Sequence, residues 1–129
     1  MQLSQKIRND RHNNLLEELL REKAGVLSRA GMAVDAAIEQ MNRMEREIEA
    51  RVSFLDSLGS HKHTPEIFQK KKLILEEINL SIDRFNVIRQ KAQLQYYYLI
   101  VTREALGLRR HEMIQDIYRI PDKKEKIRK

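Results

Sequence analysis

The sequence predicts an all-α fold, an elongated antiparallel helical hairpin of the coiled-coil type with a short third helix. Apolar residues recur mostly at steps of three, four or seven from Leu16 to Leu55 and again from Ile67 to Leu106. This spacing places side chains on one stripe of an α-helix. A single strong break, at residues 56–65, separates the two stretches. No stretch alternates with period two, so we expect no strands.

The first helix is expected to span about residues 3–57. Gly25 and Gly31 each cost about 1 kcal/mol relative to alanine inside a helix, so a break at residues 25–31 would give a three-helix bundle instead. That region holds no proline and no Asn-Gly or Asp-Gly turn. The sequence therefore favours a continuous helix.

The second helix is expected to follow a loop at residues 58–64 and to span about 65–106. Thr64 is a suitable N-cap and Pro65 fits the first helical position, while Gly107 fits the position after the helix, where the chain often turns left-handed. A short helix at about 109–118 follows. Residues 1–118 thus form one predicted domain, and residues 119–129 form a flexible tail.

The predicted pairing of the two long helices matches large residues with small ones. If the chain folds back at the loop, paired positions sum to roughly 122, so Val34 faces Ile88 and Ala24–Val26 faces Tyr96–Tyr98. Leucines off the main stripe then need a second surface. A homodimer that forms a four-helix bundle is the simplest way to cover them. These leucines are Leu15, Leu19, Leu73 and Leu80.

The composition gives little support to an enzyme. The chain has no cysteine and only four glycines, and it has no Gly-rich phosphate loop and no Gly-x-Ser-x-Gly motif. No glutamate is followed three residues later by histidine, which excludes the carboxylate-bridged di-metal bundle. We expect no catalytic activity, no cofactor and no metal site. The histidines, His12, His61, His63 and His111, are interpreted as polar surface residues.

The sequence predicts a non-enzymatic protein-interaction module, such as an adaptor, scaffold or chaperone-like protein. It would bind a partner helix, or a second copy of itself, through apolar stripes. The residues predicted to contact the partner are Leu15, Leu19, Tyr97, Tyr98, Leu99, Val101, Arg109 and Arg110.

The alternative is a nucleic-acid-binding small subunit. The net charge is +6, and residues 119–129 carry six basic and two acidic residues, which is +4 of that total. Such a basic segment favours phosphate contacts. The residues predicted to make them are Lys70, Lys71, Lys72, Lys123, Lys124, Lys126, Arg128 and Lys129.

No membrane contact is expected, because 34% of the residues are charged. The longest strongly apolar run, Tyr96–Val101, is far shorter than the ~20 residues of a membrane span. Met1–Asn14 is polar and lacks the apolar core of a secretory signal. These features predict a cytoplasmic protein.

Overall fold

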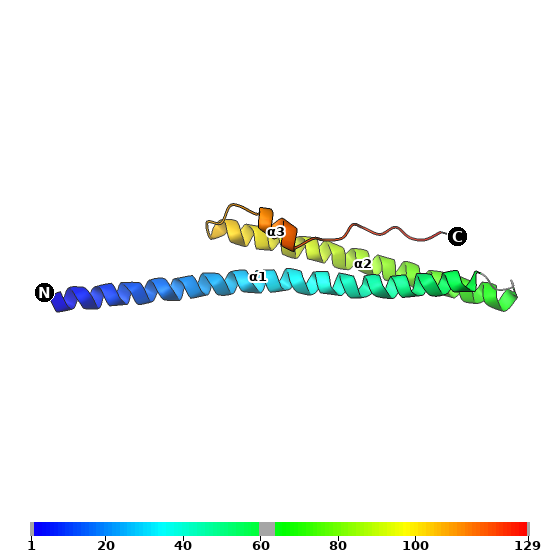
Figure 1. The fold of residues 1–129 in the computed structure, drawn as a ribbon, viewed down its shortest axis with the longest axis horizontal. Helices are drawn as coiled ribbons and strands as arrows, with labels where there is room; N and C mark the ends of the chain where they lie inside the picture. The colour runs from blue at the N-terminus through cyan, green and yellow to red at the C-terminus, as the bar shows by residue number, and fades with distance from the viewer. Residues whose placement is uncertain (1, 60–63, 129) are drawn as a thin grey trace.

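The protein is a long helical hairpin in a computed structural model that describes residues 2–59 and 64–128. Helix α1 (Gln2–Leu58) packs against α2 (Pro65–Ala105), and a short α3 (Glu112–Ile117) follows. The two long helices run antiparallel (Figure 1). The all-α hairpin is confirmed, and the described residues contain no strand. Helix α3 is shorter than the helix predicted at 109–118.

Helix α1 passes through Gly25 and Gly31 without a break. Gly31 is buried, and a β-carbon at this position would lie 2.9 Å from the hydroxyl oxygen of Tyr118. The absence of a β-carbon at Gly31 therefore admits a bulky neighbour, as the sequence suggests. That neighbour is Tyr118, from the segment after α3, and not the predicted tyrosines of the second helix.

The ends of α2 have the local bonds that their residues predict. The Thr64 hydroxyl oxygen accepts a hydrogen bond from the Ile67 N–H at 3.2 Å, with Pro65 as the first helical residue. After the helix, Gly107 adopts a φ of 87°. The Gly107 N–H then donates to the Glu104 carbonyl at 3.0 Å, and the Leu108 N–H donates to the Arg103 carbonyl at 2.9 Å. These two bonds form a complete Schellman motif.

The core is a seam with a seven-residue repeat on both helices. On α1 the buried residues include Val34, Met41, Ile48 and Leu55, and on α2 they include Ile78, Phe85, Ala92 and Leu99. A constant step of seven is the spacing that keeps one stripe of a helix facing a partner helix along its length. The seam fixes which side of α1 faces α2.

The pairing of the two helices differs from the predicted register. The Arg51 guanidinium donates a hydrogen bond to the Ser81 hydroxyl across the interface, whereas the predicted register places residue 71 opposite Arg51. Ten residues of helix span about 15 Å, which is farther than an arginine side chain reaches. Helix α2 is therefore shifted toward the turn, and it starts beyond the end of α1 (Figure 1).

The C-terminal segment also differs from prediction, because it is docked and not a flexible tail. Residues 119–128, called the tail segment here, run back along α2 in the opposite direction (Figure 1). Ile120 and Ile127 pack against the hydrophobic core. Two asparagines and one arginine of α2 hold the backbone of this segment through hydrogen bonds.

Candidate interaction surfaces

The first surface is the N-terminal end of α1, residues 2–22, called the arm here. Every residue of the arm is exposed, and this end of α1 extends past the end of α2 (Figure 1). The exposed fractions of Leu15 and Leu20 are both 64%. The other large apolar residues of the arm are Leu3, Ile7, Leu16 and Leu19.

The seven-residue repeat of the core seam continues along α1 into the arm, past the end of α2. Counting back from the buried Leu55, Ile48, Met41 and Val34 in steps of seven leads to Leu27 and then to Leu20. Buried Ala37 leads in the same way to Ala30, Lys23 and Leu16. Leu16 and Leu20 thus occupy the same repeat positions as the core residues. They are exposed because α2 ends before it reaches them.

The second predicted surface lies near the C-terminal end of α2, where some of the predicted residues are exposed and one is buried. Tyr97 is 61% exposed, and Tyr98 and Val101 are also exposed. The rings of Tyr97 and Tyr98 lie 6.1 Å apart between their centroids. Leu99 is only 3% exposed because it belongs to the seam, so it is a core residue and is not available to a partner.

The region after α2 is folded back by Arg103. The Arg103 Nη2 donates to the Arg110 carbonyl at 2.9 Å, and its Nε donates to His111 Nδ1 at 3.3 Å. His111 Nε2 lies 3.2 Å from the Glu104 carboxylate. Arg109 and Arg110 themselves are exposed beside this connection.

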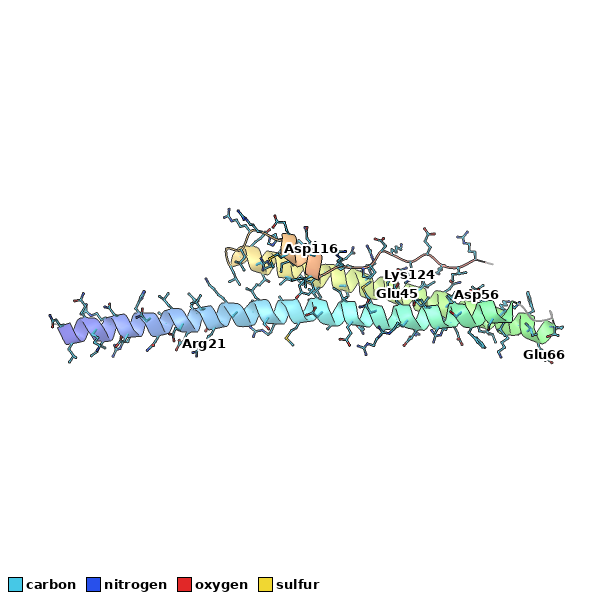
Figure 2. All side chains as sticks on the ribbon, viewed as in Figure 1. Arg21, Glu45, Asp56, Glu66, Asp116 and Lys124 are labelled. Carbon is cyan, nitrogen blue, oxygen red and sulfur yellow. The ribbon has the colours of Figure 1, made fainter. Side chains whose placement is uncertain are left out.

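The predicted nucleic-acid residues fall into an exposed group and a group that is already paired. Lys124 Nζ lies 3.3 Å from the Glu45 carboxylate and 5.0 Å from the centre of the Phe85 ring. Figure 2 places the Glu45 and Lys124 side chains next to each other, where the tail segment passes α1 and α2. Lys126 Nζ lies 3.4 Å from the Asp83 carboxylate. Two of the four described lysines and arginines predicted in the tail segment therefore have acidic partners.

The remaining basic residues that were predicted to bind nucleic acid are mostly exposed. Lys70, Lys72, Lys123 and Arg128 are exposed, and Lys71 is half-buried. Lys70 Nζ lies 5.5 Å from the centre of the Phe54 ring. Lys71 and Lys72 border an open hollow of about 660 Å³ together with Phe68 and Leu75. Lys129 lies outside the described residues.

Sequence reasoning missed a third surface, the α2 face that holds the tail segment. Asn86 Nδ2 donates to the Lys124 carbonyl at 2.9 Å, and Asn86 Oδ1 accepts from the Lys124 N–H at 2.9 Å. Asn79 makes the same two bonds with Ile127, at 3.1 and 2.9 Å. Arg89 Nε donates to the Pro121 carbonyl at 2.7 Å. Asn79, Asn86 and Arg89 are called the tail site here.

A signal for the tail site is present in the sequence. Asparagine is a poor residue for a helix interior, because its amide competes for backbone hydrogen bonds. Two asparagines seven residues apart in a long helix are both on one face. Their spacing therefore indicates a helix face that makes side-chain hydrogen bonds.

The structure offers no cluster for a metal ion among residues 2–59 and 64–128. His12 lies on the exposed arm, and His111 is engaged with Glu104 and Arg103. His61 and His63 lie outside the described residues. In the same part of the chain, no helix combines the length and the apolar character that crossing a bilayer requires.

The chain matches no known protein-family profile, no curated protein and no solved structure.

Proposed function

We propose that the protein is a non-enzymatic helical interaction module that binds a partner helix through its arm, and that this partner is a second copy of the chain. The observation that carries the proposal is the continuation of the core seam through Leu16 and Leu20 past the end of α2. A partner helix would cover these leucines as α2 covers Met41 and Ile48.

The cost of an uncovered arm supports the need for a partner. An isolated helix has marginal stability in water, and most helical stability in proteins comes from packing of an apolar face. The arm holds six large apolar residues, and all of them are exposed. Covering them would remove apolar surface from water, which stabilises the assembly by about 25 cal/mol for each Å² buried.

The charges of the arm favour a second copy as the partner. Residues 2–12 carry Lys6, Arg8 and Arg11 against Asp10, and residues 13–22 carry Arg21 against three glutamates, Glu17, Glu18 and Glu22. The first half of the arm is therefore +2 and the second half −2. Two arms in antiparallel contact would place opposite charges together, and Leu3 and Ile7 would lie near the leucines of the other copy. Such a contact is a self-complementary twofold interface.

The alternative nucleic-acid function receives less support. The ion pairs of Lys124 and Lys126 reduce the positive charge of the tail segment, and the bonds to α2 hold that segment along its own protein. A phosphate-binding segment would need these cations free to release counterions from the nucleic acid.

Light scattering after size exclusion tests the proposal. We expect the full chain to have twice its single-chain mass of 15.4 kDa. Replacing Leu16 and Leu20 by glutamate should return the mass to that of one chain, because like charges and lost apolar contacts then oppose the interface. Val87→Glu with Leu94→Glu, at two other exposed apolar residues of α2, is the matched control and should keep the larger mass. A wild-type monomer in which the amides of residues 2–22 exchange like unfolded chain would contradict self-association through the arm.

A further inference from the structure

We propose that the tail site is a binding site for extended peptide segments. In this proposal the tail segment is its internal ligand, and an extended segment of the same chemistry from a partner protein replaces it. The chemistry is defined by three positions of the tail segment. They are a branched aliphatic residue, a lysine four residues later, and a second branched aliphatic residue three residues after the lysine, as in Ile120, Lys124 and Ile127.

The tail site binds the backbone of the tail segment, and the spacing of its asparagines along α2 matches the spacing of the bonded residues along the segment. Each asparagine uses one N–H of its amide as a donor and its side-chain oxygen as an acceptor, and these pair with the C=O and N–H of one residue of an extended chain. Asn79 and Asn86 are seven helical residues apart, or about 10.5 Å along α2. Lys124 and Ile127 are three residues apart, or about 10 Å in an extended chain. The two repeats agree, so both asparagines bind the segment without strain.

Arg89 adds one further hydrogen bond to the site, and its donor matches the acceptor that it meets. Its partner is Pro121, which has a carbonyl group but no N–H. An arginine side chain has donors and no acceptor. The side chain that only donates thus meets the residue that only accepts, while the asparagines meet residues that do both.

Side-chain contacts give the site its selectivity. Ile120 and Ile127 pack against the core, and Lys124 lies between the Glu45 carboxylate and the Phe85 ring. Of the residues between these positions, Pro121 is half-buried, and the others are exposed, namely Asp122, Lys123, Glu125 and Lys126. Backbone bonds that give affinity and side-chain contacts that give specificity are the pattern of extended-peptide recognition.

The tail segment is suited to exchange because it packs on the outside of the hairpin core and supplies no fully buried residue to it. The buried core residues all belong to α1 and α2. In residues 119–128 no residue is fully buried. Segments with few buried contacts open at a lower free energy than the core, so the tail segment is able to leave while the helices stay packed.

The test uses a fluorescent peptide of residues 118–129 and three full-length proteins. In the first variant Ile120→Asp and Ile127→Asp weaken docking of the protein's own tail segment. The second variant adds Asn79→Ala and Asn86→Ala. By fluorescence anisotropy, the first variant should bind the peptide at least about tenfold more tightly than the wild type, because a tethered ligand competes at millimolar effective concentration. The second variant should lose at least about tenfold of that affinity, and a peptide with both isoleucines replaced by aspartate should not bind.

Equal binding to the wild type and the first variant would overturn the proposal, as would unchanged binding to the second variant. Absence of binding to a first variant with wild-type helicity by circular dichroism would also overturn it. If that variant loses helicity, hydrogen exchange of the isotope-labelled wild-type chain decides the question. Unlabelled peptide in excess should then remove the protection of the Lys124 and Ile127 amides, and retained protection would contradict exchange. The mass of the arm variants does not enter this test, so the two proposals fail independently.

Discussion

The Ser81 hydroxyl accepts a hydrogen bond from the Arg51 guanidinium across the interface between α1 and α2. Ser81 is only 3% exposed, so its hydroxyl needs a partner inside the protein. Arg51 lies on the core face, seven residues after Met44, which packs against the core. A polar pair in an apolar seam is a known way to fix the register of two helices.

Replacing Ser81 by alanine should lower the free energy of unfolding by about 1 kcal/mol, since one part-buried hydrogen bond is lost. Ser53→Ala, at an exposed position of α1, is the control and should change that free energy by less than about 0.5 kcal/mol. Urea unfolding followed by circular dichroism measures both. Equal effects of the two substitutions would show that the Arg51 bond does not stabilise the hairpin.

The two glycines of α1 should respond differently to alanine. At Gly25 a β-carbon would meet only the end of the Arg29 side chain, at 3.4 Å. Gly25→Ala should therefore raise the free energy of unfolding by about 0.5–1 kcal/mol, the ordinary advantage of alanine in a helix. Gly31→Ala should gain less, because its β-carbon displaces the Tyr118 hydroxyl.

Combining Gly31→Ala with Tyr118→Ala separates these two effects. The gain from alanine at position 31 should be fully recovered once Tyr118 is removed. A gain at Gly31 that is the same with and without the tyrosine ring would contradict the packing of Tyr118 against α1. Thermal and urea unfolding of the four proteins form a double-mutant cycle.

Stability should fall at high pH through Tyr118. Burial raises the pKa of this phenol above its usual value of 10.0, and the nearby Asp35 carboxylate raises it further. The folded protein therefore holds the proton more tightly than the unfolded chain, so the free energy of unfolding decreases as the pH rises above 10. Tyr118→Phe should show a smaller decrease over the same range. Urea unfolding at a series of pH values tests this, and identical slopes for the two proteins would disprove it.

Gly107 should be sensitive to substitution although the space around it is open. Apart from Gly107 itself and its two chain neighbours, no atom of residues 2–59 and 64–128 lies within 4 Å of a β-carbon built at this position, and the backbone φ is 87°. Gly107→Ala should therefore cost about 1 kcal/mol of unfolding free energy from the backbone alone. Gly107→Asn should cost less, because asparagine adopts left-handed conformations more readily. The comparison is made by urea unfolding, and an equal cost for both would point to a different cause.

The helices were predictable because each is specified by local signals. The steps between apolar residues predict the core faces, and Thr64, Pro65 and Gly107 specify where α2 begins and ends. The arm was partly predictable as well, since Leu15 and Leu19 lie outside the main stripe. Leu99 also lies on the apolar stripe of the second helix, seven residues after Ala92, so its burial was predictable from the repeat and its assignment to the partner surface was wrong.

The register and the docked tail segment were not predictable from such local signals. The predicted register assumed that the chain reverses at the centre of the loop, so that paired positions sum to about 122. The observed register differs because it depends on how particular side chains pack, such as those of Arg51 and Ser81. The tail segment has no apolar periodicity and a net charge that suggests a solvated chain. Its position depends on hydrogen bonds from Asn79 and Asn86, which are far from it in the sequence.

Hydrogen bonding to main-chain atoms makes the tail segment more sensitive to insertions than to substitutions. Substitutions at Asp122, Lys123 and Glu125 leave the bonds of Asn79 and Asn86 to the backbone of Lys124 and Ile127 unchanged. A one-residue insertion between Lys124 and Ile127 would instead separate the two anchor points by an extra ~3.3 Å, and only one asparagine would then reach its partner. The binding of this segment thus depends on a length, three residues of extended chain against seven of helix, in addition to the identity of the two asparagines.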